Sequence, residues 1–216
     1  MFFVMFALKL LENALDTPGF FDCKPFYVPL SGFGRMVMHR RKDMSMDKVR
    51  FGRTELMVSR VALGGIPIMR LDPKDATAVV HEALALGINF IDTARAYTDS
   101  EEKIGAAIRG IPRDELVLST KSLGQTAEEL CAHLDTSLTN LGVDYVDIFH
   151  LHSISSRERY DNIFMENGPV HWLQQQIAAG KVRFAAFSSH TIDLAVEIMQ
   201  TNLFDVVQLP LNFVDR

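Results

Sequence analysis

From Met46 onward, short apolar runs alternate with longer segments in which apolar residues recur at helical spacing. The runs that we interpret as strands are Val61–Leu63, Phe90–Ile91, Leu116–Leu118, Val146–Phe149, Val182–Phe187 and Val206–Leu209. Between them, apolar residues three or four positions apart indicate amphipathic helices. A strand followed by a helix, repeated along the chain, predicts an α/β fold with a parallel sheet and helical crossovers.

Capping residues mark the ends of the helices, of which we expect about five. The helical segments are 75–86, a segment starting after Asp99, 126–141, a segment from about Pro169 to Gly180, and 193–201. Asp99, with Glu102 three positions later, has the pattern of a capping box. Gly142 and Gly180 follow the last helical positions of their segments, where glycine commonly ends a helix.

A parallel sheet with helical crossovers can be a doubly wound open sheet or a closed barrel. The turn at 63–67 lacks the spaced glycines of a dinucleotide-binding fingerprint, which counts against the open sheet. The preceding segment 49–59 could form a hairpin across a barrel floor, with Gly52 and Arg53 at its turn. A TIM-type (β/α)8 barrel needs eight strands and eight helices, so the six strands counted here predict an incomplete one.

Residues 1–45 show no sustained period, because proline and glycine interrupt them repeatedly. We expect this part to be a disordered leader of unknown role. Its apolar start, Met1–Leu8, is too short to span a bilayer and lacks the basic start of a signal peptide. We therefore assign the partial barrel to residues 46–216 and expect no membrane association.

Composition and charge narrow the classes of partner. The 216-residue chain is 48% hydrophobic and 23% charged, a mixture typical of one globular domain. The formal net charge of −5 argues against nucleic acid, because phosphate binding needs a basic surface. Cys23 and Cys131 lack a metal-binding spacing and suit a reducing compartment, so we expect a cytoplasmic protein.

Four polar side chains follow the expected strands. They therefore belong to the carboxyl ends of the strands, where the active site of a (β/α) fold usually lies. Asp92 ends one strand, Tyr97 lies in the loop after it, and Lys121 and His152 end the next two strands. Taken singly, Asp92 could cap a turn and Tyr97 could be a surface or packing residue. A buried ammonium at Lys121 would need a carboxylate partner, however, and Asp92 on the neighbouring strand can supply one.

His150 lies two positions before His152 and shares its face of the strand. Two histidines at this spacing could bind a metal, but no cysteine or carboxylate is placed to complete such a site. We therefore expect no metal site and interpret His150 as a hydrogen-bonded core residue.

We interpret the four side chains together as a proton-donor system. A tyrosine phenol is a weak acid at neutral pH, and a nearby ammonium lowers its pKa. We expect Asp92 to hold Lys121, Lys121 to lower the pKa of Tyr97, and His152 to orient a carbonyl oxygen that Tyr97 protonates. The hydride for such a reduction must come from a cofactor.

The segments that carry these residues resemble those of the aldo/keto reductase family. They are Phe90–Tyr97, Ser119–Lys121, Asp147–His152, Gly180–Ser189 and Val207–Asn212. The resemblance implies a barrel enzyme that reduces an aldehyde or ketone, a small-molecule substrate, with NADP, or alternatively NAD, as cofactor. It implies that Tyr97 is the general acid, and that Gly65, Ser188, Ser189 and Gln208 bind the cofactor, with Ser189 where the family usually has Asn.

Two segments, 64–68 and 98–105, resemble a subgroup that often carries a C-terminal iron–sulfur extension, which this sequence lacks. The chain ends just after the sixth strand, so we expect unpaired sheet edges that favour self-association. Two hypotheses follow. The first is a carbonyl reductase, and the second is a truncated, catalytically inactive relative that acts as a binding or regulatory subunit.

Overall fold

The computed structural model describes residues 46–210. The leader expected over residues 1–45 lies outside the described residues, as does the end of the sixth strand motif at 211–212. The expectation of disorder in the leader therefore stays a prediction.

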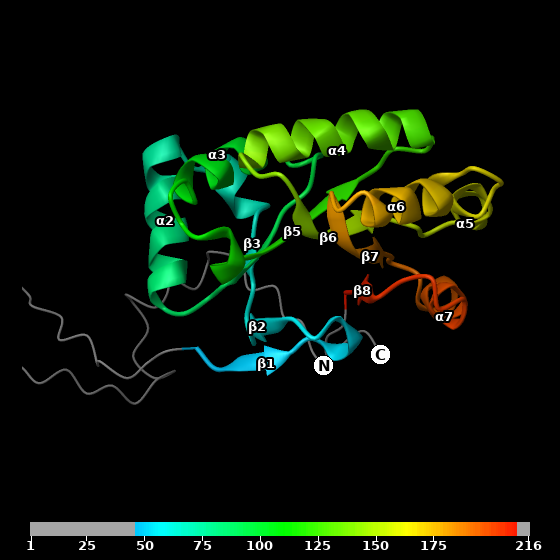
Figure 1. The fold of residues 1–216 in the computed structure, drawn as a ribbon, viewed down its shortest axis with the longest axis horizontal. Helices are drawn as coiled ribbons and strands as arrows, with labels where there is room; N and C mark the ends of the chain where they lie inside the picture. The colour runs from blue at the N-terminus through cyan, green and yellow to red at the C-terminus, as the bar shows by residue number, and fades with distance from the viewer. Residues whose placement is uncertain (1–45, 211–216) are drawn as a thin grey trace, which may run out of the picture.

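A six-stranded parallel sheet with its strands in chain order forms the centre of the described part (Figure 1). Its strands are β3 (Leu63–Gly64), β4 (Phe90–Asp92), β5 (Val117–Ser122), β6 (Val146–Leu151), β7 (Val182–Ser188) and β8 (Val206–Gln208). The sheet curls into a half-barrel, which confirms the predicted incomplete (β/α)8 fold. Within the described residues β3 and β8 are its edge strands.

Helices follow the strands and pack on the outer face of the curled sheet (Figure 1). They are α2 (Pro73–Ala85), α3 (Ser100–Ala107), α4 (Ala127–Leu141), α5 (Arg157–Ile163), α6 (Pro169–Ala178) and α7 (Ile192–Gln200). Three 3-10 turns span Gly52–Thr54, Pro67–Arg70 and Arg113–Glu115. Among the described residues, no helix is both long and apolar enough to cross a membrane.

Alternation along the strands divides the core into two clusters. Outward-facing residues such as Leu118 and Phe149 pack under the helices, in the larger cluster. Inward-facing residues such as Phe90, Val117 and Ile148 form the smaller one. The polar residues Ser119 and Lys121 follow Val117 on the inward face of β5, so the site lies on the inner side of the sheet.

The predicted hairpin closes the inner cluster from below. Strands β1 (Lys48–Arg50) and β2 (Met57–Ser59) pair antiparallel, and Phe51, Leu56 and Val58 pack against the inner face of the sheet. At the turn, Arg53 Nε donates to Asp205 Oδ1 at 3.0 Å, which ties the hairpin to the segment before β8. The hairpin thus bridges the half-barrel floor, as predicted.

Local capping chemistry explains some of the helix ends. Thr126 accepts a hydrogen bond from the Glu129 amide at 3.2 Å, and Gly142 ends α4 with a φ of 68°. The capping box predicted at Asp99 is wrong. Asp99 stands at the N-cap position, but its carboxylate pairs with Lys103 Nζ at 2.9 Å and makes no capping hydrogen bond.

The sequence analysis missed helix α5, which follows β6. This helix has seven mostly polar residues, so it lacks the apolar period on which the prediction relied. Its signal was Ser156, whose hydroxyl accepts from the Arg159 amide at 3.2 Å as an N-cap. The first strand was also placed two residues too early, at Val61 instead of Leu63.

Candidate active site

A buried ion pair lies on the inner face of the sheet, at the carboxyl ends of β4 and β5. Lys121 Nζ is 2.6 Å from Asp92 Oδ2 and donates a second hydrogen bond to the Thr93 carbonyl oxygen at 2.7 Å. Lys121 is 1% exposed and Asp92 5%. A cation this deeply buried requires its carboxylate. The pairing predicted from strand alternation is confirmed.

Ser119 and His150 extend the ion pair into a hydrogen-bonded chain across three strands. Ser119 Oγ donates to Asp92 Oδ1 at 2.9 Å and lies 3.0 Å from His150 Nε2. The Ser119 hydroxyl has one proton and uses it in the hydrogen bond to Asp92. His150 Nε2 must therefore be the donor in the hydrogen bond to Ser119. His150 is therefore the hydrogen-bonded core residue that the sequence predicted.

The Asp92 carboxylate stays ionised in spite of its burial. Desolvation alone would raise its pKa, but the charge of Lys121 and hydrogen bonds from Lys121 and Ser119 outweigh it and lower the pKa below the ordinary value. Gln208 Nε2 on β8 also donates to Asp92 Oδ2, at 3.2 Å. One carboxylate thus joins the lysine to the glutamine that the family resemblance assigns to the cofactor.

The rings of Tyr97 and His152 lie next to this pair. Lys121 Nζ is 5.4 Å from the centre of the Tyr97 ring, and the Tyr97 and His152 ring centres are 6.1 Å apart in an edge-to-face arrangement. The structure therefore brings together all four side chains predicted to be catalytic. The residues after both rings, Thr98 and Ser153, have positive φ values of 41° and 59°, a strained backbone common at functional sites.

The prediction that Lys121 lowers the pKa of Tyr97 is wrong for this structure. Burial raises the pKa of Tyr97 to about 12, and the negative charge of Asp92 adds to the rise. Lys121 does not outweigh these two effects, since Asp92 at 2.6 Å offsets much of the charge of its ammonium. At neutral pH the Tyr97 phenol therefore keeps its proton.

His152 is neutral in this environment. Desolvation, followed by the positive charge of Lys121, lowers the pKa of His152 to about 4. A neutral imidazole has one ring N–H group, which can donate a hydrogen bond to a substrate oxygen while the ring stays uncharged. This electrostatic setting suits the orienting role predicted for His152.

The serine pair after β7 has two different environments. Ser188 is the register partner of Gln208 on β8, and its Oγ accepts from the Ser153 amide at 2.9 Å. The Ser189 hydroxyl is buried and donates to the Ile154 carbonyl oxygen at 2.7 Å. Ser188 and Gln208 thus stand on the inner rim, whereas Ser189 secures the loop behind it.

Gly65 lies where the chain leaves β3. Its amide donates to the Asp92 carbonyl oxygen at 2.7 Å, and its own carbonyl oxygen accepts from Ser100 Oγ at 2.9 Å. A Cβ at this position would stand 2.7 Å from Ser100 Oγ and 2.8 Å from Thr93 Oγ1. Close packing accounts for glycine here, and the predicted cofactor contact of Gly65 stays a prediction.

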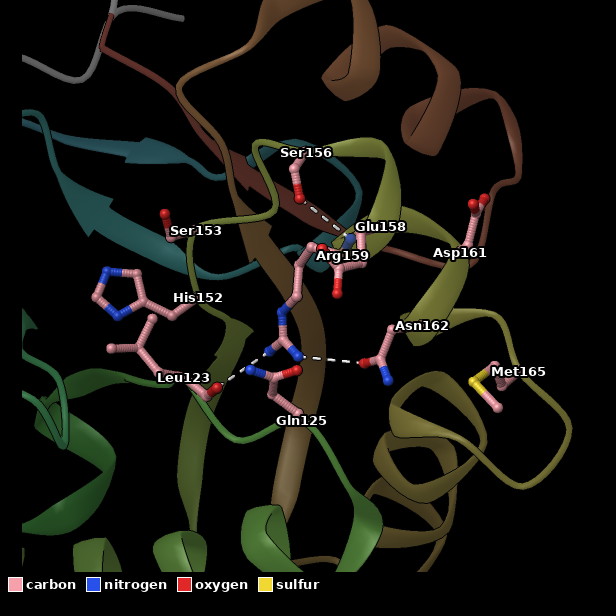
Figure 2. A pocket seen from close by; sticks show the side chains of 10 residues that line it. All are labelled: Leu123, Gln125, His152, Ser153, Ser156, Glu158, Arg159, Asp161, Asn162 and Met165. Atoms are coloured by element: carbon pink, nitrogen blue, oxygen red, sulfur yellow. Dashed lines mark hydrogen bonds between the residues drawn. The ribbon is translucent and has the colours of Figure 1, made fainter.

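A pocket of 920 Å³ opens beside His152, between the loops that follow β5 and β6 (Figure 2). Its lining residues are Leu123, Gln125, His152, Ser153, Ser156, Glu158, Arg159, Asp161, Asn162 and Met165. Apart from His152, the sequence analysis singled out none of them, because they lie in loops and on the short polar helix α5, which carry no apolar period. Such a pocket next to a candidate catalytic residue is where a substrate would be expected.

The two inward-facing histidines make stability depend on pH. The ordinary pKa of 6.5 falls to about 3 for His150 and about 4 for His152, with desolvation the largest cause in both. Between pH 6.5 and about 4 the unfolded chain binds protons that the folded chain does not. The free energy of unfolding should therefore fall as the pH is lowered through this range.

Urea denaturation at about pH 7.5 and about pH 5 tests this expectation. His150→Gln keeps a donor for Ser119 but cannot titrate, so it should lose less stability than the parent chain on acidification. Replacing the exposed His171 in the same way is the control and should change nothing. An equal acid-induced loss in His150→Gln and the parent would rule His150 out.

Known proteins of one family are similar to this chain. The model of the aldo/keto reductase family matches residues 60–216. L-galactose dehydrogenase of Arabidopsis thaliana is 34% identical over 162 residues, covering 68% of this chain and 50% of that protein. NADH-specific methylglyoxal reductase of Escherichia coli is 28% identical over 200 residues, covering 79% of this chain and 60% of that protein.

A solved structure of an aldo-keto reductase from Klebsiella pneumoniae in complex with NADPH is also similar. It has a TM-score of 0.56 and 28% identity, covering 67% of this chain and 50% of that chain. The chain spans 50% and 60% of the two curated relatives above. Since the family model covers most of the sequence, this chain belongs to the aldo/keto reductase family.

Proposed function

We propose that this chain contributes the catalytic centre of an oxidoreductase that reduces an aldehyde or ketone to an alcohol with a nicotinamide cofactor. The observation that carries the proposal is the buried Asp92–Lys121 pair, with the rings of Tyr97 and His152 beside it. A buried charge pair next to a phenol and a neutral imidazole is costly to build and suits proton transfer.

In the proposed reaction Tyr97 is the general acid. Its raised pKa keeps the phenol protonated until negative charge develops on the carbonyl oxygen. The Lys121 ammonium, held by Asp92, then stabilises the phenolate that remains. His152 donates a hydrogen bond to the same oxygen and orients it. The hydride comes from the reduced nicotinamide when it is bound, so that carbon receives the hydride and oxygen the proton.

The residues on β7 and β8 fit an amide-bearing nicotinamide. A hydroxyl at Ser188 and a carboxamide at Gln208 are register partners at the carboxyl end of the sheet, beside Lys121. Hydroxyl and amide groups supply both the donors and the acceptors that a carboxamide requires. We therefore propose Ser188 and Gln208 as nicotinamide-binding residues, while the Ser189 hydroxyl is engaged with the backbone.

We propose NADP as the cofactor and a small carbonyl compound as the substrate, in a cytoplasmic enzyme. The complex of the Klebsiella enzyme with NADPH supports NADP, whereas the name of the Escherichia coli relative refers to NADH. Names of two further relatives, 6-dehydroglucose reductase and glycerol 2-dehydrogenase, point to hydroxylated compounds. Polar side chains in the lining of the pocket beside His152, such as those of Gln125 and Asn162, are compatible with these.

Cofactor titration tests the proposal. Purified protein should change the fluorescence of NADPH, bind NADPH more tightly than NADH, and oxidise NADPH when an aldehyde such as methylglyoxal is added. Stronger binding of NADH than of NADPH would contradict the proposed preference for NADP and leave the proposed reductase activity in place. Neither binding nor turnover with either nucleotide would overturn the proposed activity of this chain.

A further inference from the structure

The pocket beside His152 contains one positively charged side chain, Arg159, at its centre (Figure 2). Arg159 comes from helix α5, and its guanidinium lies between the loop after β5 and the helix itself. Because His152 and Arg159 line the same pocket, one small ligand could contact both. The chemistry around Arg159 then decides what that ligand can be.

Every hydrogen bond made by the Arg159 guanidinium among the described residues goes to a neutral acceptor. Nη1 donates to Asn162 Oδ1 at 3.2 Å, and Nη2 donates to the carbonyl oxygens of Leu123, at 3.3 Å, and Gly124. A guanidinium has five N–H groups, so two remain for a ligand. The existing contacts hold the guanidinium in place and leave part of its donor capacity for use in the pocket.

Arg159 forms no ion pair in the part of the chain that the structure describes. Other arginines in that part do, such as Arg113 and Arg183 with Asp147 and Arg157 with Glu197. Desolvation lowers the pKa of Arg159, only partly offset by the charge of Glu129. A half-buried cation without a direct counter-ion favours an anionic ligand.

The acidic residues that line the pocket occupy exposed positions on α5. Glu158 and Asp161 are both exposed to solvent, and the Asp161 carboxylate points away from the guanidinium (Figure 2). Water and salt screen such exposed charges more strongly than a half-buried one. They still repel a doubly charged group more than a singly charged one, so a carboxylate suits this pocket better than a phosphate.

We propose that Arg159 binds the carboxylate of a substrate whose carbonyl oxygen is held at His152. The proposal rests on the proposed reductase function and narrows its substrate class to carbonyl compounds that carry a carboxylate. The amides of Gln125 and Asn162 and the hydroxyl of Ser153, in the same lining, supply neutral contacts for the chain between the two groups. Arg159 is then a specificity-determining residue and takes no part in proton transfer.

Matched substrates test the proposal. Succinic semialdehyde is compared with butanal, and 4-carboxybenzaldehyde with benzaldehyde, so that each pair differs by the carboxylate. We expect kcat/KM to favour the acid in at least one pair by about tenfold to hundredfold, the usual effect of a hydrogen bond to a charged group. Arg159→Met should remove this preference and leave the neutral aldehyde almost unaffected.

Two control variants separate charge from folding. Arg159→Lys keeps the charge and should keep part of the preference. Arg157→Met removes the neighbouring exposed arginine, which pairs with Glu197 at 2.7 Å, and should leave the preference intact. If Arg159→Met slows acid and neutral aldehydes equally, or if the parent chain shows no preference, the carboxylate site is refuted while the reductase function stands.

Calorimetric titration gives a readout that does not need turnover. The parent chain should bind 4-carboxybenzaldehyde more tightly than benzaldehyde, and Arg159→Met should abolish the difference. Inorganic phosphate is titrated alongside, and tighter binding of phosphate than of the carboxylate would overturn the assigned ligand class. If no aldehyde is reduced but the Arg159-dependent binding is found, the proposed reduction fails and the anion site remains. Absence of that binding refutes the site.

Discussion

A Tyr97→Phe variant is expected to reduce aldehydes about 10²- to 10⁴-fold more slowly than the parent chain, the usual contribution of a general acid. The variant lacks the phenolic proton but keeps the ring, whose edge-to-face contact with His152 at 6.1 Å does not require the hydroxyl. Steady-state oxidation of NADPH in the presence of a saturating aldehyde measures the effect. The loss should appear in kcat, because the proton is transferred after the substrate binds.

The pKa of about 12 sharpens this expectation. A phenol that stays protonated across the neutral range gives a rate with little pH dependence from Tyr97 itself between about pH 6 and about pH 9. Tyr145→Phe, on a ring that packs 4.1 Å from the Arg113 guanidinium carbon, is a matched control and should retain the parent rate. Undiminished turnover by Tyr97→Phe would remove Tyr97 from the mechanism.

An Asp92→Asn variant is expected to lose about 3–5 kcal/mol of folding free energy, the usual cost of leaving a buried charge without its partner. Lys121 is 1% exposed, so its ammonium cannot reach water when the carboxylate is gone. The substitution keeps the shape of Asp92 and one acceptor for Ser119. Urea denaturation at neutral pH measures the loss from the transition midpoint.

A double variant distinguishes a lost charge from lost packing. Asp92→Asn combined with Lys121→Met removes both charges, so it should be more stable than Asp92→Asn alone. Arg157→Met breaks an exposed pair, with side chains 56% and 42% exposed, and should cost at most about 1 kcal/mol. A single variant as stable as the parent chain would mean that Lys121 is not charged when buried.

The alternating strand pattern was enough to predict where the candidate catalytic side chains lie. Because strand side chains alternate, it placed Lys121 on the inward face, and because β4 and β5 are consecutive parallel strands, it brought Asp92 to Lys121. It also predicted the hairpin that closes the floor. These inferences succeeded because they depend on periodicity and strand order, both of which are local properties of the sequence.

The direction of the Tyr97 pKa shift could not be predicted in this way. It depends on how deeply the phenol is buried and on whether the Lys121 charge is already neutralised, and both are set by side chains from three segments. The chain from His150 through Ser119 to Asp92 was missed for a similar reason. Each hydrogen bond in this chain joins residues about thirty positions apart in the sequence. Ser119 and Asp92, for example, are 27 positions apart.

By itself the sequence determined the parallel half-barrel, the inward positions of its polar residues and the family, because repeated periods and short motifs encode them. Only the tertiary structure decided which groups are charged, which hydroxyls are already engaged, and that Arg159 from the short helix α5 lines a pocket with His152. The physical reason is that burial and electrostatic potential at a point sum over all nearby atoms, whatever their separation along the chain.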